Sequence, residues 1–176
     1  MDKLWAPWRA KYVTTLIGKV KGCVFCRLLK EKQDKKNYIF FRSTHAFAVL
    51  NIYPYSNGHV LILPYRHVAD LKNLSSAEKT DVWQLVEDVK DILDVAMAPG
   101  GYNIGLNLGR VAGAGFPGHL HIHIVPRWKG DVNFMPVVSN TKIISQSLNV
   151  IYRKLLQCAH AKKLKSSKTK SSRRMR

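Results

Sequence analysis

The sequence has few cysteines and no long apolar run, and both absences narrow the classes of protein to which it could belong. Only 3 of its 176 residues are cysteine, too few for a disulfide framework. No apolar run approaches the roughly 18 residues of a transmembrane helix, and residues 1–9 lack the apolar core of a secretion signal. These absences predict a cytoplasmic protein without a membrane span. A length of 176 residues with 46% apolar composition is enough for one globular domain.

Acidic residues are also scarce, and the resulting positive charge lies mainly at the two ends. The chain has 29 Lys and Arg against 11 Asp and Glu, a net charge of +18. Residues 1–43 carry 11 basic against 3 acidic residues, and residues 44–161 carry 10 against 8. Because residues 162–176 carry 8 against 0 and almost nothing apolar, we expect a disordered basic tail over 161–176 that contacts nucleic acid or acidic surfaces. Residues 1–20 contain two tryptophans and are expected to form an extension that packs on the domain.

Between the ends, the apolar pattern predicts an α+β fold. Runs rich in aromatic and β-branched residues predict strands at Tyr38–Phe41, Ala46–Ile52, His59–Leu63, Tyr102–Leu108 and Leu120–Val125. Ser75 and Glu78 have the spacing of a capping box, and apolar residues at helical spacing follow as far as Pro99. A second helical pattern extends from Ile144 to Leu155. We therefore expect an antiparallel sheet of about five strands with one main helix and a C-terminal helix.

The strongest candidate for a functional site is a run of alternate histidines, His119, His121 and His123. Side chains alternate along a strand, so the three imidazoles are expected on one face, with about 6.7 Å between successive Cα atoms of the set. The apolar residues between them would then face the core. One alternative is a polar strand face that happens to use histidine. Another is a metal site built from all three, which is less favourable because side chains along one straight strand do not wrap easily around one ion.

A glycine-rich segment leads directly into the histidines. Residues 109–118 contain four glycines, whose backbone can direct N–H groups at an anion without obstruction by side chains. Many such segments are ordinary turns. Next to the histidines, however, the segment suggests a phosphate held above an imidazole, which can attack phosphorus and form a covalent phosphoramidate.

Cys23 and Cys26 form a Cys-x-x-Cys motif with three possible explanations. They could be two unrelated thiols or a redox pair, although the βαβ context of thioredoxin-like motifs is absent. They could also be half of a zinc site, which would need two more ligands, and isolated histidines are available for that.

Two of these motifs resemble the histidine triad family. Residues His119–Val125 match its signature of three histidines separated by apolar residues, and Asn51–His59 is similar to its hairpin, with Asn57 where the family usually has proline. The resemblance covers residues 21–160, which we take as the domain. Trp5–Arg9 and Pro126–Val137 are similar to a narrower branch, the bacterial diadenosine tetraphosphate phosphorylase-like proteins.

The resemblance implies a nucleotide-binding enzyme that cleaves at an α-phosphate through a covalent nucleotidyl-histidine, with no catalytic metal. It implies that His121 is the nucleophile and that His123 binds phosphate oxygens. The implied substrate contacts are Asn51 to ribose and Asn107, Ala114 and Gly115 to phosphate. For Asn51 and Asn107, capping of a turn or strand end is the alternative role.

The resemblance also implies a structural zinc ion and a homodimer. The zinc ligands would be Cys23, Cys26, His67 and His119. The substrate would be a dinucleoside polyphosphate such as diadenosine tetraphosphate, cleaved by phosphorolysis or hydrolysis. Phosphorolysis is favoured by Arg110, Arg127 and Lys129, which flank the histidines and could hold a second anion. The alternatives are removal of adenylate from nucleic-acid ends, as in aprataxin-like members, and a non-catalytic nucleic-acid-binding adaptor.

Overall fold

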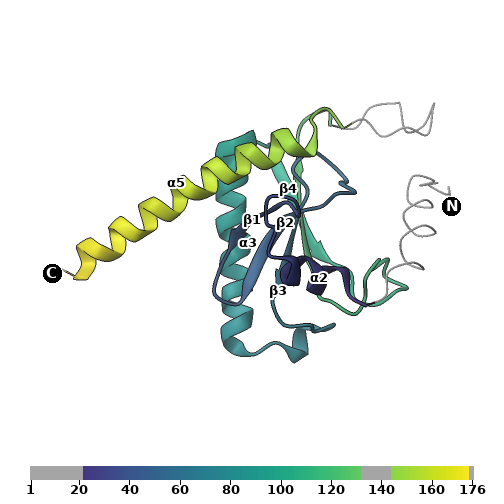
Figure 1. Cartoon of the computed structure of the whole chain (residues 1–176). Coiled ribbons are helices and arrows are strands. Elements are labelled where there is room, and N and C mark those ends of the chain that lie inside the picture. Colours follow the sequence, from purple (N-terminus) through teal and green to yellow (C-terminus); the bar gives the residue numbers. More distant parts are fainter. Residues whose placement is uncertain (1–21, 132–143, 175–176) are drawn as a thin grey trace.

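A computed structural model of the chain describes residues 22–131 and 144–174 and consists of one open antiparallel sheet with helices on both faces (Figure 1). The expected packing of residues 1–20 lies outside the described residues. The sheet has five strands in the order β1-β2-β3-β5-β4. The strands are β1 (Ile39–Arg42), β2 (Ala46–Leu50), β3 (Val60–Pro64), β4 (Gly101–Leu106) and β5 (Ile122–Arg127). The helices are α2 (Val24–Glu31), the 3-10 turn η1 (Leu71–Asn73), α3 (Ser76–Met97) and α5 (Leu148–Arg174).

The fold confirms the expected α+β class, with small shifts at the ends of the strands. One of these shifts concerns the histidine segment, where β5 begins at Ile122 and not at Leu120. The reason lies in the backbone hydrogen bonds: the N–H of Leu120 donates to the carbonyl of Val68 at 2.6 Å, and that of His119 to Phe116 at 3.4 Å. The first two histidines are therefore held by loop segments, and only His123 lies within the strand.

Both faces of the sheet are buried along β2 and β3, because helices cover each of them, whereas the edge strand β4 is partly exposed. In β2, Ala46, Ala48 and Leu50 belong to the larger apolar cluster with α3 and α5, whereas Phe47 and Val49 belong to a second cluster with α2. Adjacent residues thus face opposite sides, as the two-residue period of a strand requires. Figure 1 shows α3 and α5 on one side of the sheet and α2 on the other.

Helix α3 begins at the expected capping box. The Ser75 hydroxyl accepts from the N–H of Glu78 at 3.2 Å, and the Glu78 carboxylate accepts from the N–H of Ser75 at 2.8 Å. The same carboxylate receives two hydrogen bonds from Arg66, at 2.9 and 2.7 Å. At the other end of α3, Met97 packs on the β2–β3 turn at Gly58, whose φ of +70° and close approach to the Met97 sulfur require glycine.

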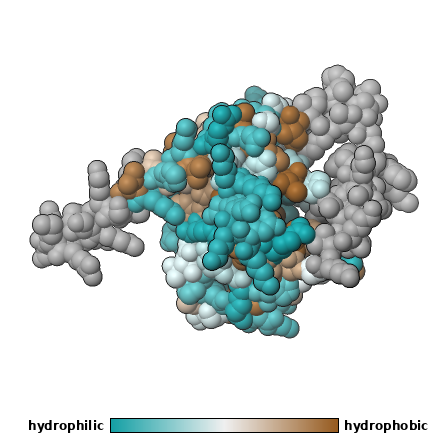
Figure 2. Space-filling model, in the orientation of Figure 1, coloured by the Kyte–Doolittle hydropathy of each residue, from teal (hydrophilic) through white to brown (hydrophobic). Residues whose placement is uncertain are grey.

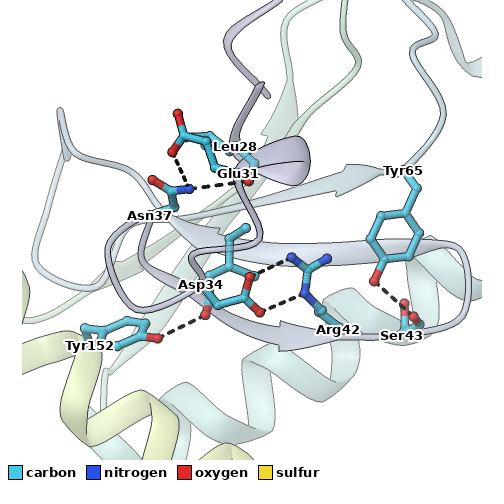
Figure 3. A network of polar contacts seen from close by, with 9 residues as sticks. Leu28, Glu31, Asp34, Asn37, Arg42, Ser43, Tyr65 and Tyr152 are labelled. Atoms are coloured by element: carbon cyan, nitrogen blue, oxygen red, sulfur yellow. Dashed lines mark hydrogen bonds and ion pairs between the residues drawn. The ribbon is translucent and has the colours of Figure 1, made fainter. Parts of the chain in front are cut away.

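The segment between α2 and β1 is held by a polar network (Figure 3). Arg42 of β1 donates two hydrogen bonds to Asp34, at 2.8 and 2.7 Å, and this ion pair holds the pKa of the Asp34 carboxyl below its usual value. The Asn37 amide donates to the carbonyl of Leu28 at 3.3 Å. From α5, the Tyr152 hydroxyl donates to the carbonyl of Ile39 at 3.1 Å. These bonds fasten α2 and α5 to the same edge of the sheet.

The C-terminal segment is part of α5, and the disordered basic tail expected over 161–176 stays a prediction. Helix α5 begins at Leu148, not at Ile144, and continues to Arg174 without a break. Residues 148–174 contain neither glycine nor proline, so nothing in the sequence ends the helix. Lys162 also forms ion pairs with Asp88 at 3.0 Å and Asp91 at 2.7 Å on α3, which extends the packed part of the helix.

Because the apolar clusters lie between the sheet and the helices, mainly polar residues remain for the surface. The face shown in Figure 2 is mainly hydrophilic, with separate hydrophobic residues between polar ones. Within residues 22–131 and 144–174, no helix combines the length and apolar composition needed to cross a membrane.

Glu78 should make the stability of the fold sensitive to acid. Its hydrogen bonds with Arg66 and Ser75 lower the pKa of the carboxyl from 4.5 to about 2. A carboxyl whose pKa is lowered by folding stabilises the folded state above its unfolded pKa, and this contribution is lost as the pH falls from 4.5 towards 2. In urea denaturation, Glu78→Gln should lower the free energy of unfolding at pH 7 and flatten its decline below pH 4.5. The exposed Glu87→Gln is the control, and an acid profile of Glu78→Gln equal to wild type would contradict the assignment.

Candidate functional site

The three histidines lie on the α2 side of the sheet, as their alternation predicts. The ring of Phe25, on α2, is 5.6 Å from the ring of His119 and 5.5 Å from that of His121, measured between centroids. The rings of His121 and His123 are 5.0 Å apart. The intervening Leu120 and Ile122 are buried in apolar clusters. The segment therefore presents its imidazoles to one side although only part of it is a strand.

One ring nitrogen of His121 is fixed by its own backbone segment. Nδ1 lies 2.8 Å from the carbonyl oxygen of His119, so Nδ1 carries the hydrogen and donates it. In the neutral ring, Nε2 then carries the lone pair. Burial lowers the pKa of the His121 imidazole, and the hydrogen bond to the His119 carbonyl opposes this shift. The side chain is thus prepared to act as a base or a nucleophile through Nε2.

His123 is joined to a fourth histidine, His59, at the end of the β2–β3 hairpin. The N–H of Tyr55 donates to Nδ1 of His59 at 3.0 Å, so the hydrogen of the neutral His59 ring is on Nε2. That nitrogen is 2.9 Å from Nδ1 of His123 and donates to it. The hydrogen of the neutral His123 ring is consequently on Nε2, which makes this atom a donor.

Sequence reasoning missed the direct contact of His59 with the triad. The residue is fully buried, yet both of its ring nitrogens have polar partners. Its position immediately after Asn57-Gly58 was the available signal, because a turn that closes β2 on β3 brings this residue beside the neighbouring strand β5.

A second cluster brings together the four residues that the resemblance assigned to zinc. The ligand atoms of Cys23, Cys26, His67 and His119 all lie within 4.8 Å of one another and could hold a metal ion. Nδ1 of His119 is 3.3 Å from the Cys23 sulfur, 3.6 Å from the Cys26 sulfur and 3.4 Å from Nδ1 of His67. A tetrahedral zinc ion with bonds of about 2.0–2.3 Å separates its ligand atoms by about 3.3–3.8 Å. The donor set and its spacing therefore fit zinc.

The other ring nitrogen of His119 supports the same arrangement. Nε2 is 3.0 Å from the carbonyl oxygen of Pro64 and donates to it, so Nδ1 is left with its lone pair facing the cysteines. Burial, then the neighbouring Cys23 thiol, raise the pKa of the Cys26 thiol. A bound cation would reverse this effect, because it favours the thiolate.

The two asparagines occupy different positions relative to the histidines. Oδ1 of Asn51 accepts from the N–H of Tyr53 at 2.9 Å, which is the turn-capping role given as the alternative to ribose binding. Asn107 directly follows β4, whose last residue Leu106 is paired with Ile122. If the pairing continued by one residue beyond the two strands, Asn107 would lie opposite His121.

The glycine-rich segment is folded on itself. The N–H of Gly113 donates to the carbonyl of Arg110 at 2.9 Å, and that of Ala114 to Gly109 at 3.2 Å. In this conformation the N–H of Ala114 already donates a hydrogen bond within the loop. It could donate to an oxyanion only after the loop rearranges. Gly115 is half-buried beside it. The segment leads into the histidines, but in this conformation it does not form a complete anion-binding site.

Arg127 is less available for a second anion than the sequence suggested. Its guanidinium donates to both oxygens of Asp131, at 2.6 and 2.8 Å, and to Oδ1 of Asn103 at 2.9 Å. Arg110 and Lys129 have exposed side chains.

Comparison with known proteins agrees with this geometry. A family model described as "HIT domain" matches residues 32–130. An "AP-4-A phosphorylase" of Mycobacterium tuberculosis is 32% identical over 154 residues, covering 84% of this chain and 79% of the relative. A "Bis(5'-nucleosyl)-tetraphosphatase [asymmetrical]" of Schizosaccharomyces pombe is 38% identical over 93 residues, covering 53% of this chain and 50% of the relative.

Solved structures show the same fold. A histidine triad nucleotide-binding protein of Sulfolobus tokodaii superposes with a TM-score of 0.65 at 23% identity, covering 79% of this chain and 93% of the other. A zinc-bound histidine triad family protein of Mycobacterium smegmatis gives a TM-score of 0.66 at 22% identity, with coverages of 83% and 97%. With its four-histidine arrangement, its sheet order and the match of more than half of its residues to the family model, this chain belongs to the HIT domain family.

Proposed function

We propose that this protein cleaves dinucleoside polyphosphates at the α-phosphorus through a nucleotidyl intermediate on His121. The observation that carries the proposal is the 2.8 Å hydrogen bond from Nδ1 of His121 to the carbonyl of His119. It leaves Nε2 as the nucleophilic atom in a ring that burial keeps neutral. The names of the phosphorylase and tetraphosphatase relatives support the substrate class.

In the first step, Nε2 of His121 attacks the α-phosphorus and forms a P–N bond. The bond between the α-phosphorus and the bridging oxygen breaks, and the remaining nucleoside polyphosphate leaves with the electron pair of that oxygen. His123 is the proposed partner for the phosphate oxygens. The hydrogen bond from Nε2 of His59 to Nδ1 of His123, called the relay below, leaves Nε2 of His123 as a donor. Asn107 would donate its amide to the same phosphate, and Ala114 and Gly115 would do so after the loop opens. Asn51, whose side chain caps its turn, is also proposed to contact the ribose.

In the second step, an acceptor attacks the nucleotidyl-His121 and releases the imidazole. We propose that inorganic phosphate is this acceptor, so that diadenosine tetraphosphate yields ATP in the first step and ADP in the second. The support comes from the similarity to the phosphorylase over 84% of the chain and from the exposed Arg110 and Lys129, which flank the triad in the sequence.

We further propose that Cys23, Cys26, His67 and His119 bind a structural zinc ion. Their spacing fits tetrahedral coordination, and none of the proposed catalytic steps requires a metal. Zinc would hold α2 and its Phe25 against the histidines. A pair of thiolate ligands suits a reducing compartment, which agrees with the expected cytoplasmic location.

A homodimer is also proposed, formed through the outer strand of the sheet. β4 lies at one edge and is paired with β5 alone among the described strands. Its Ile104 side chain is 42% exposed. A second β4 paired with this edge would extend the sheet and cover the exposed backbone groups.

His121→Ala should remove nearly all turnover of diadenosine tetraphosphate, at least a hundredfold, while nucleotide binding remains measurable, because only the covalent step needs that imidazole. Turnover and trapping of radiolabelled adenylate on the protein are the measurements. The control is His160→Ala, which removes an exposed imidazole on α5. A His121→Ala variant that keeps more than about a tenth of the wild-type rate would exclude His121 as the nucleophile.

Cys23→Ser should release zinc and lower the unfolding temperature by about 5–10 °C, the shift caused by losing about 2–3 kcal/mol in a domain of this size. Metal analysis of protein purified without chelator should give about one zinc per wild-type chain. Cys158→Ser, which changes a cysteine outside the cluster, should keep both the metal and the unfolding temperature. Metal-free wild-type protein that is folded and active would reject the zinc site.

Titration with inorganic phosphate should separate phosphorolysis from hydrolysis. With diadenosine tetraphosphate as substrate, we expect ATP at every phosphate concentration and a second product that changes from AMP to ADP as phosphate rises. The reason is that phosphate and water compete for the same nucleotidyl-histidine. Chromatography of the products is the measurement. AMP as the sole second product at saturating phosphate would reject phosphorolysis and leave a triad hydrolase.

A further inference from the structure

Tyr55 lies against the third histidine although no motif singles it out. It belongs to the turn that joins β2 to β3 and is 39% exposed. Its ring is nearly parallel to that of His123, with an interplanar angle of 7° and centroids 5.8 Å apart. The same ring is 4.6 Å from the ring of His59. One aromatic side chain thus contacts both imidazoles of the relay.

The backbone of Tyr55 acts on the same pair. Its N–H donates to Nδ1 of His59 at 3.0 Å and thereby directs the hydrogen of His59 towards His123. Any residue other than proline at position 55 would keep this bond. Substitutions at position 55 therefore test the contribution of the side chain while the backbone hydrogen bond to His59 remains.

We propose that the ring of Tyr55 is a positioning residue that covers the His59–His123 hydrogen bond and holds the His123 imidazole in the orientation needed by the substrate. This inference rests on the proposed role of His123 as a donor to phosphate oxygens. His59 is fully buried and His123 is half-buried, so the exposed Tyr55 ring lies between this pair and the solvent. Covering the pair excludes water, which would otherwise compete for the 2.9 Å hydrogen bond.

A ring pressed against His123 also limits its rotation about the side-chain bonds. A parallel aromatic neighbour stabilises one orientation of an imidazole, and a displacement of about 1 Å at a catalytic group reduces turnover strongly. Tyr55 acts through His123 and would not itself contact the reacting atoms. Its loss should consequently lower kcat more than it raises KM.

The alternative is that Tyr55 stacks on the base of the substrate. An exposed aromatic ring beside a nucleotide site could do this, and its loss would then weaken substrate binding and raise KM. The ratio of the two kinetic effects separates the explanations.

The experiment compares Tyr55→Ala, Tyr55→Phe and Tyr53→Ala with the wild-type protein, using diadenosine tetraphosphate. Tyr53 is the matched control, because it lies on the same turn and is 43% exposed. We expect Tyr55→Ala to lower kcat about tenfold with KM changed less than about twofold, whereas Tyr55→Phe and Tyr53→Ala stay within about twofold of wild type. A rise in KM at unchanged kcat, or wild-type kinetics of Tyr55→Ala, would overturn the proposal.

A spectroscopic measurement keeps this test independent of the proposed reaction. The hydrogen on Nε2 of His59 should give a slowly exchanging imidazole resonance in the wild type and in Tyr55→Phe, assigned by its disappearance in His59→Gln. Tyr55→Ala should lose it through exchange with water while the rest of the spectrum remains folded. If the wild type proves inactive on the dinucleotide, the proposed function fails but the resonance still decides the role of Tyr55. Retention of the resonance in Tyr55→Ala would overturn it.

Discussion

The site depends on one backbone carbonyl, that of His119, which accepts the hydrogen of His121. The ring of the same residue is fixed on one side by the Pro64 carbonyl and faces the two cysteines and His67 on the other. A single residue therefore takes part in the metal-ligand cluster and sets the tautomer of its neighbour two positions away. Whatever holds the His119 ring also holds the peptide group that orients His121. Through this shared residue, the Cys-His cluster and the orientation of His121 are structurally coupled.

The histidines divide into two groups with different tasks, although they share one side of the sheet. His67 and His119 face the thiols, whereas His59 and His123 form a relay that ends at a donor nitrogen. His121 lies between the groups. Phe25, which lies between the two cysteines in the first turn of α2, contacts His119 and His121. One apolar ring therefore packs on a histidine of the Cys-His cluster and on His121.

Much of this could be predicted from the sequence, because short-range patterns determine it. Alternation placed the three imidazoles on one side, and the spacing of Ser75 and Glu78 identified the start of α3. The ligand set required the family resemblance, since His67 is 52 residues from His119 and no local pattern joins them. The hydrogen bond between His59 and His123 depends on a tertiary contact, and that of the Ala114 amide depends on a loop conformation that no residue pattern specifies. The disordered tail stays a prediction from composition, which could not show that Lys162, near its start, forms ion pairs with α3.

The length of α5 has a consequence for how the molecule moves in solution. Its 27 residues, at a rise of about 1.5 Å each, make a rod of about 40 Å, and Figure 1 shows its end extending well beyond the sheet. A compact chain of 176 residues has a radius of gyration of about 16 Å. With such a rod attached, the molecule tumbles anisotropically and diffuses more slowly than its mass implies. The friction of a single chain therefore depends on this one helix as well as on the domain from which it projects.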